Sequence, residues 1–236
     1  MELKVYKKEY EYSYSLGAFP TIELLKNRID DVIEVIIHSS FDNKEVLNTI
    51  KSLLPKDKIR YNDKLVSKLS DKGNCFIIGV FKKYKSNLSD SDHILFDNPS
   101  NMGNLGTMIR SALGFNIINI AIIKPGLDYF DPKVIRASMG SIFSVNIEFF
   151  DTLADYKKKY NNHTIYSFML DGKCDLRDVE FKANPLTLAF GNEATGLSSE
   201  YLDDNSIYIK HSKNIDSLNI TNALSIALYE YSKNNF

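Results

Sequence analysis

The chain has 236 residues, of which 44% are hydrophobic and 25% are charged, and its formal net charge is −1. This composition is typical of a globular protein with one large or two small cores, and it argues against a protein that coats nucleic acid non-specifically. The chain has no apolar run of about eighteen residues, and its first residues, MELKVYKKEYEY, contain no apolar stretch. We therefore expect neither a membrane span nor a secretory signal.

The cysteines and histidines are few and scattered. Cys75 and Cys174 lie far apart in apolar settings, which is typical of free thiols in a reducing compartment. The four histidines stand singly, without the spacing of a metal site. We expect a cytoplasmic protein with no bound metal.

The first 84 residues alternate between helix-like and strand-like segments, which predicts a small α/β domain over 1–84. Its expected helices are Thr21–Arg28, Asn43–Leu54 and Lys64–Leu69, and its expected strands are Val32–Ile37 and Cys75–Phe81.

The residues after this domain differ in composition and predict a linker over 85–92. Residues 82–92, KKYKSNLSDSD, have no apolar face. Residues 1–88 carry 16 Lys and Arg against 12 Asp and Glu, whereas the remainder carries 13 against 18. The N-terminal part is therefore the better candidate for contacting phosphate groups.

Strands and helices alternate regularly over residues 93–236. The expected strands are Ile94–Phe96, Ile117–Ile123, Val145–Phe150, Thr164–Met169, Leu186–Phe190 and Ile207–Ile209, and the expected helices are Leu105–Leu113, Pro132–Gly140 and one that follows Asn219. Long apolar runs indicate strands that are buried on both faces. The pattern predicts an α/β domain with a mainly parallel sheet and helices on each side.

The strand Leu186–Phe190 ends in the loop GNEATG, in which two glycines bracket the carboxylate of Glu193. Glycines permit positive φ and a close approach of a ligand to the backbone, which binding sites at strand ends require. Taken alone, Glu193 is also compatible with a turn carboxylate that caps nearby amides.

Two other polar segments precede helices. Ser217-Leu218-Asn219 opens the C-terminal helix, and its polar side chains alone would be read as helix caps. The segment Asp97–Arg110, DNPSNMGNLGTMIR, lacks the third glycine of a dinucleotide fingerprint and the Gly-Lys ending of a P-loop. Neither of those nucleotide sites is expected.

Together and in order, these segments resemble the SpoU (TrmH-like) branch of the SPOUT RNA methyltransferases. The matching motifs are Asn104-Leu-Gly106-Thr-Met-Ile-Arg110, Gly191-Asn-Glu193-Ala-Thr-Gly196 and Ser217-Leu218-Asn219. The resemblance implies methyl transfer from S-adenosylmethionine to a ribose 2′-hydroxyl of structured RNA, either tRNA or rRNA. It also implies a C-terminal trefoil knot, an L30e-like RNA-binding domain over 1–84, a catalytic domain over 93–236, and a homodimer. The segment Ser15–Thr21 looks like a loop of the L30e-like domain.

The resemblance assigns catalytic roles to five side chains, namely Asn104, Arg110, Glu193, Ser217 and Asn219. It places Arg110 at the ribose 2′-hydroxyl and the adjacent phosphate. Because a guanidinium is a very poor proton acceptor at neutral pH, we expect Arg110 to stabilise the developing alkoxide and to clamp the phosphate.

The resemblance also assigns six residues to the cofactor, mainly through their backbone groups: Met169, Leu170, Gly191, Gly196, Ile209 and Leu218. The chain departs from the family pattern after Ile209, where Lys210 and His211 replace the usual proline and methionine.

The expected partners are RNA and a second copy of the chain, with neither DNA nor a membrane. The ribose 2′-hydroxyl distinguishes RNA from DNA. The alternative is a catalytically silent RNA-binding module with the same fold, and a base methyltransferase is a variant within the enzyme class.

Overall fold

The computed structural model describes residues 2–70, 73–182, 184–203 and 205–233. The chain divides into two compact units, one formed by Met1–Tyr84 with Asp128–Ser144 and the other by Lys85–Leu127 with Val145–Phe236. The helix α5 (Pro132–Ala137), which lies within our expected catalytic domain, therefore packs with the N-terminal residues. The proposed domain boundaries remain a prediction.

The first unit contains a four-stranded sheet in the order β1-β4-β2-β3. Its strands are β1 (Tyr12–Leu16), β2 (Val32–Ile37), β3 (Ile59–Tyr61) and β4 (Ile77–Lys82), and its other helices are α1 (Ala18–Asn27), α2 (Lys44–Leu53) and α3 (Asp63–Leu69). The segment Asp128–Ser144 is attached by side chains as well as backbone. Ser13 Oγ donates to the carbonyl of Phe130 at 2.5 Å, and Phe143 packs edge-on against Phe81.

The expectation of a loop over Ser15–Thr21 is wrong. β1 ends at Leu16 and α1 begins at Ala18, so that Gly17 alone separates them, with φ of 109°. The alternation of Tyr and Ser in YSYSL is the period of a strand, and it was the signal for β1. Neither β1 nor β3 was expected.

The second unit contains a seven-stranded sheet in the order β7-β6-β5-β10-β8-β11-β9. Its strands are β5 (His93–Asp97), β6 (Asn119–Ile123), β7 (Asn146–Phe150), β8 (Thr164–Phe168), β9 (Cys174–Asp175), β10 (Leu186–Phe190) and β11 (Ser206–Tyr208), and its helices are α4 (Met102–Gly114), α6 (Leu153–Lys159) and α7 (Ile220–Ser232). Every neighbouring pair is parallel, which confirms the predicted mainly parallel α/β sheet. We did not expect α6 or β9.

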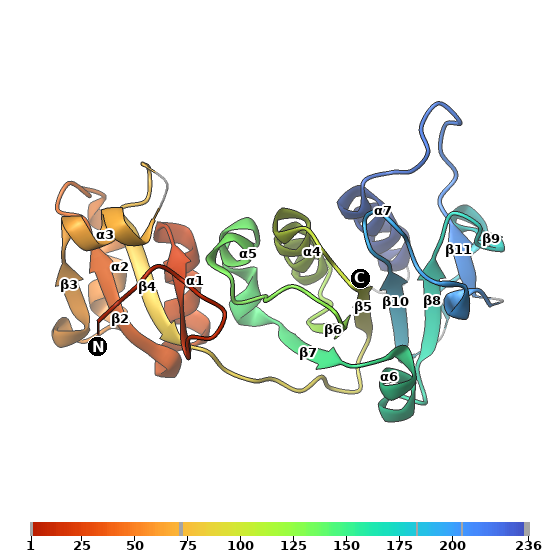
Figure 1. The fold of residues 1–236 in the computed structure, drawn as a ribbon, viewed down its shortest axis with the longest axis horizontal. Coiled ribbons are helices and arrows are strands. Elements are labelled where there is room, and N and C mark those ends of the chain that lie inside the picture. The colour runs from red at the N-terminus through yellow and green to blue at the C-terminus, as the bar shows by residue number, and fades with distance from the viewer. Residues whose placement is uncertain (1, 71–72, 183, 204, 234–236) are drawn as a thin grey trace. The chain divides into compact units, whose positions relative to one another are not determined.

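The insertion of β10 between β5 and β8 brings distant segments together (Figure 1). Phe190, the last residue of β10, pairs with Phe96 of β5 and with Phe168 of β8. The chain that leaves β10 therefore emerges between the segments that leave β5 and β8. α7 packs against α4, with the hydroxyls of Ser111 and Ser225 3.5 Å apart.

The expected linker over 85–92 forms no helix or strand, but it is tied to the second unit. The Ser86 hydroxyl donates to the Ile147 carbonyl at 3.0 Å, and the Leu88 amide donates to Glu148 at 3.2 Å. No helix in the described part of the chain is long and apolar enough to cross a bilayer.

Candidate active site in the second unit

A cavity of about 510 Å³ lies where β8, β10 and β11 end. Its walls come from the segments that follow these strands, from the first turn of α7, and from Asn104 of α4. Ligands of parallel α/β sheets bind at the carboxyl ends of the strands, and the volume lies in the range of small-molecule and cofactor sites.

The loop after β10 is tightly closed. The backbones of Asn192 and Gly196 form an antiparallel bridge, and Asn192 Oδ1 accepts hydrogen bonds from the amides of Ala194 and Thr195. A Cβ on Gly191 would lie 2.1 Å from the carbonyl carbon of Gly196, and Gly196 has φ of 69°. Gly191 therefore permits the close approach of the Gly196–Leu197 backbone, and Gly196 supplies the expected positive φ, whereas the close approach of a ligand stays a prediction.

Glu193 joins this loop to the start of α4. Its carboxylate accepts hydrogen bonds from the Ser100 hydroxyl at 2.6 Å, from the amides of Ser100 and Asn101 at 3.1 Å each, and from Asn104 Nδ2 at 3.3 Å. Burial opposes its ionisation, but the hydrogen bonds from Ser100 and Asn104 prevail and hold the pKa of Glu193 below its ordinary value. The carboxylate is thus an anion bound at a helix N-terminus.

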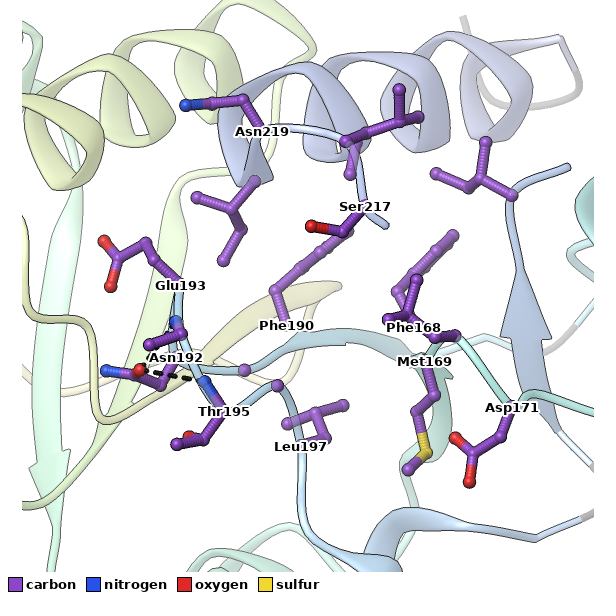
Figure 2. Close-up of a pocket in the computed structure, with 18 of the residues that line it drawn as sticks. Phe168, Met169, Asp171, Phe190, Asn192, Glu193, Thr195, Leu197, Ser217 and Asn219 are labelled. Atoms are coloured by element: carbon purple, nitrogen blue, oxygen red, sulfur yellow. Dashed lines mark hydrogen bonds between the residues drawn. The ribbon is translucent and has the colours of Figure 1, made fainter. Parts of the chain in front are cut away.

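Ser217 and Asn219 lie at the cavity end of α7. Asn219 caps the helix, because its Oδ1 accepts hydrogen bonds from the amide and the hydroxyl of Thr221 at 2.8 and 2.6 Å. Ser217 is exposed and lines the cavity. Figure 2 shows Glu193 and Asn219 at one end of the cavity and Met169 and Asp171 at the other. Asn219 therefore both caps α7 and lines the cavity.

Arg110 does not line the cavity of its own chain. It is exposed and makes no hydrogen bond or ion pair with any described residue. It stands six residues after Asn104 on α4, about 120° around the helix axis. One chain therefore brings together Asn104, Glu193, Ser217 and Asn219, but not Arg110.

The residues assigned to the cofactor all line the cavity: Met169, Leu170, Gly191, Gly196, Ile209 and Leu218. They share it with two aromatic rings that the sequence analysis did not single out. Phe168 and Phe190 stack with ring centroids 4.5 Å apart and an interplanar angle of 6°. Phe168 is the last residue of β8 and Phe190 is the last residue of the neighbouring strand β10. Their position at strand ends is the feature of the sequence that could have placed them in the cavity wall.

The motifs also did not predict several other polar residues of the site. Ser100 and Asn192 hold Glu193 and its loop, and Asp171 follows Leu170 in the cavity wall. His211 lines the cavity as well, and its Nδ1 donates to the Ile209 carbonyl at 2.7 Å. The described residues include no group of three or more His, Cys, Asp or Glu side chains placed to hold a metal ion.

Known proteins resemble this chain in sequence and in fold. The profile of the SpoU rRNA Methylase family matches residues 92–229. A 23S rRNA uridine 2′-O-methyltransferase of Streptomyces viridochromogenes is 32% identical over 146 residues, which are 58% of this chain and 50% of that protein. A 23S rRNA adenosine 2′-O-methyltransferase of Streptomyces laurentii is 29% identical over 61% of this chain and 55% of that protein. The chain thus spans about half the length of these curated relatives.

The fold of the chain is also found among solved structures. The structure of the SpoU methyltransferase AviRb from Streptomyces viridochromogenes, in complex with AdoMet, superimposes with a TM-score of 0.78 at 23% identity. The superposition covers 95% of this chain and 90% of that one. At 23% identity, this likeness is evidence for the fold alone.

Proposed function

The chain belongs to the SpoU rRNA methylase family, and from this premise we propose that it transfers the methyl group of S-adenosylmethionine to a ribose 2′-hydroxyl of structured RNA, either tRNA or rRNA. The observation that carries the proposal is the single cavity that joins residues of three motifs far apart in the sequence: Asn104, Glu193 and the segment Ser217–Asn219. The names and AdoMet-bound structure of the similar proteins support the same reaction.

The cavity suits a cofactor with a flat base and a polar tail. The stacked rings of Phe168 and Phe190 and the side chain of Leu218 supply apolar wall, and Gly191 lies in the same wall. The carboxylate of Asp171 supplies hydrogen-bond acceptors at the end of the cavity opposite Glu193 (Figure 2). When bound, S-adenosylmethionine supplies an electrophilic methyl group on a sulfonium.

The residues of the chain would act by positioning. Glu193 is held by three donors of the Ser100–Asn101 segment and by Asn104, so that its orientation is set before RNA arrives. Its neighbours Ser217 and Asn219 carry polar groups that face the same cavity and can orient a ribose hydroxyl. Such pre-set geometry accounts for roughly 7–11 kcal/mol of barrier lowering in favourable cases.

We further propose that the C-terminal segment forms a trefoil knot and that the first unit is an L30e-like RNA-binding domain. The position of β10 between β5 and β8, and the return of the chain from β11 to α7 beside α4, support the knot. The positive balance of residues 1–88 supports an RNA-binding role for the first unit. We propose a cytoplasmic protein, with RNA rather than DNA as the partner and no membrane partner.

We propose that the active form is a homodimer in which Arg110 of one copy completes the site of the other. The support is the position of Arg110, which is exposed, unpaired among the described residues, and absent from the cavity wall of its own chain. A closed two-fold dimer would use the same surface of α4 twice.

The same observation favours the second candidate function, a silent RNA-binding module. If no second copy brings Arg110 to the cavity, the chain lacks the cation that would stabilise the developing charge.

Transfer of a tritiated methyl group from S-adenosylmethionine to bulk RNA tests the proposal, with nucleoside mass spectrometry of the product. We expect incorporation as 2′-O-methylnucleosides. Binding of RNA without incorporation would establish the silent module, and methylated bases would establish a base methyltransferase.

A further inference from the structure

A second, smaller cavity of about 210 Å³ adjoins the first across the loop after β10. The two cavities share the wall residues Asn192, Thr195, Gly196 and Leu197. The smaller one is completed by Asp97 and Asn98 at the end of β5 and by Ser198. Its volume lies below that of pockets for whole drug-sized ligands and is suited to a single flat ring system.

The polar groups of this cavity are held in place. Asp97 Oδ2 accepts a hydrogen bond from Tyr201 at 2.7 Å, which leaves Oδ1 as an acceptor. The backbone of Asn98 is fixed on both sides, because its amide donates to the Ile123 carbonyl at 3.1 Å and its carbonyl accepts from Asn192 Nδ2 at 2.7 Å. Asn98 also adopts φ of 49°, in the left-handed region.

The side chain of Asn98 is half-buried, and within the described parts of the chain it has no hydrogen-bond partner. The hydroxyl of Thr195, an exposed residue, also has no hydrogen-bond partner within those parts. An amide with a donor and an acceptor beside a carboxylate oxygen matches a base edge that presents an amine next to a ring nitrogen. Adenine and cytosine have such an edge, whereas uracil presents a carbonyl in place of the amine.

The position of the cavity relates it to the reacting ribose. Asn98 lies two residues before Ser100, which donates to Glu193, and Thr195 lies two residues after Glu193. A ribose held at Glu193 would therefore have its base within reach of the shared loop.

We propose that this small cavity receives the nucleobase of the nucleotide whose 2′-hydroxyl is methylated, and that Asp97 and Asn98 select bases with an exocyclic amine beside a ring nitrogen. This inference rests on the proposed function for the identity of its ligand. It adds a base-reading site to the cofactor and ribose sites.

Binding of nucleotides to the cavity can be measured without catalysis. We would titrate the ¹⁵N-labelled full chain, in the presence of S-adenosylhomocysteine, with the 5′-monophosphates of adenosine, cytidine and uridine and with ribose 5-phosphate. The first two should shift the Asn98 side-chain and Thr195 amide signals. Uridine monophosphate should bind about tenfold more weakly, because it leaves one hydrogen bond unmade. Ribose 5-phosphate should leave these signals unchanged.

Two variants sharpen the measurement. Asn98→Gly keeps the left-handed backbone and removes the amide, so it should abolish the preference over uridine monophosphate. Asn116→Gly is the matched control, since Asn116 also has positive φ, at 59°, and lines neither cavity. Equal shifts with ribose 5-phosphate, no shifts with any nucleotide, or an unaltered preference in Asn98→Gly would overturn the inference.

The outcomes separate this inference from the proposed function. A chain that binds the bases in the cavity but methylates no RNA would contradict the function and leave base binding intact. If the chain methylates RNA but the signals of the small cavity do not respond to the bases, only the base-reading site would be contradicted.

Discussion

The carboxylate of Glu193 accepts a hydrogen bond of 2.6 Å from the hydroxyl of Ser100, which lies 93 residues earlier in the chain. This contact ties the loop after β10 to the segment that leads into α4. It sets the position of the only glutamate within the three motifs, and its disruption has a clear expected cost.

Glu193→Gln should lower methyl transfer on the order of tenfold to hundredfold while leaving the fold intact. The amide nitrogen that replaces one carboxylate oxygen cannot accept from Ser100 or Asn101, so the loop loses its orientation. Single-turnover rates and the unfolding midpoint would be measured together. Glu200→Gln, at an exposed carboxylate bonded to Ser198, is the control and should be near wild type. An unchanged rate would contradict the positioning role.

Arg110→Ala and Arg110→Lys should abolish most methyl transfer without weakening the binding of S-adenosylhomocysteine. Arg110 is exposed and lies outside the cavity, so neither cofactor affinity nor stability depends on it. Lysine keeps the charge but lacks the planar fork of donors. Calorimetric binding and methyl transfer would be measured on the same preparations. Wild-type turnover in both variants would show that Arg110 has no catalytic role.

A mixture of Arg110→Ala and Glu193→Gln chains should regain activity if Arg110 acts on the partner's site. In randomly exchanged two-fold dimers, about a quarter of the sites then contain both native residues. Activity should rise with mixing time after subunit exchange, above the low residual activity of either variant alone. A mixture as inactive as its components would argue that both residues serve the same chain's site.

Gly191→Ala should destroy cofactor binding and destabilise the second unit. The added Cβ would lie 2.1 Å from the Gly196 carbonyl carbon and 2.3 Å from the Leu197 amide nitrogen, so the loop would have to open. Gly114→Ala is the matched control, because no atom beyond its chain neighbours and the adjacent backbone of α4 lies within 4 Å of its added Cβ. The control should be neutral or stabilising by up to about 1 kcal/mol. Equilibrium denaturation and cofactor binding would be compared for both variants.

The buried His93 and its half-buried neighbour His163 should make the protein less stable as the pH falls. Burial lowers the pKa of His93 to about 4, and burial also lowers the pKa of His163. In the unfolded chain these histidines bind protons near pH 6.5, whereas in the folded chain they bind protons only at lower pH. Stability should be full above about pH 7 and should decline from pH 6.5 towards 4, by up to about 3 kcal/mol for His93.

Burial and the nearby charge of His163 favour the neutral form of His93, and they prevail over the hydrogen bond to Ser89, which favours the charged form and raises the pKa. The Nε2 of His93 faces the Ser89 carbonyl at 2.7 Å, and its Nδ1 is 2.8 Å from the Tyr156 hydroxyl, which lies 2.6 Å from Thr187 Oγ1. Asp90 and Asp92 favour the charged form only weakly. Urea denaturation between pH 4 and 8 would measure the slope. His93→Phe should flatten it, whereas His38→Gln, in the first unit, should not.

Local patterns were sufficient for two strands that are mainly apolar. Val32–Ile37 and Leu186–Phe190 were expected with the bounds that β2 and β10 have, because each is a short apolar run between polar breaks. β3 and β9 have three and two residues, and such short pairings depend on the neighbouring strand rather than on their own sequence. The packing of Asp128–Ser144 with the first unit likewise depends on long-range contacts such as that of Ser13 with Phe130.

The sequence by itself determined the three motifs and the parallel α/β pattern, because residue type and spacing are local properties, and the family resemblance that the motifs carry named ten residues that line the cavity. Only the tertiary structure decided that Glu193 binds the start of α4, that Asp97 and Asn98 border a second cavity, and that Arg110 lies outside the site of its own chain. The reason is physical: the insertion of β10 between β5 and β8 decides which loops meet, and no periodicity in one chain encodes that order.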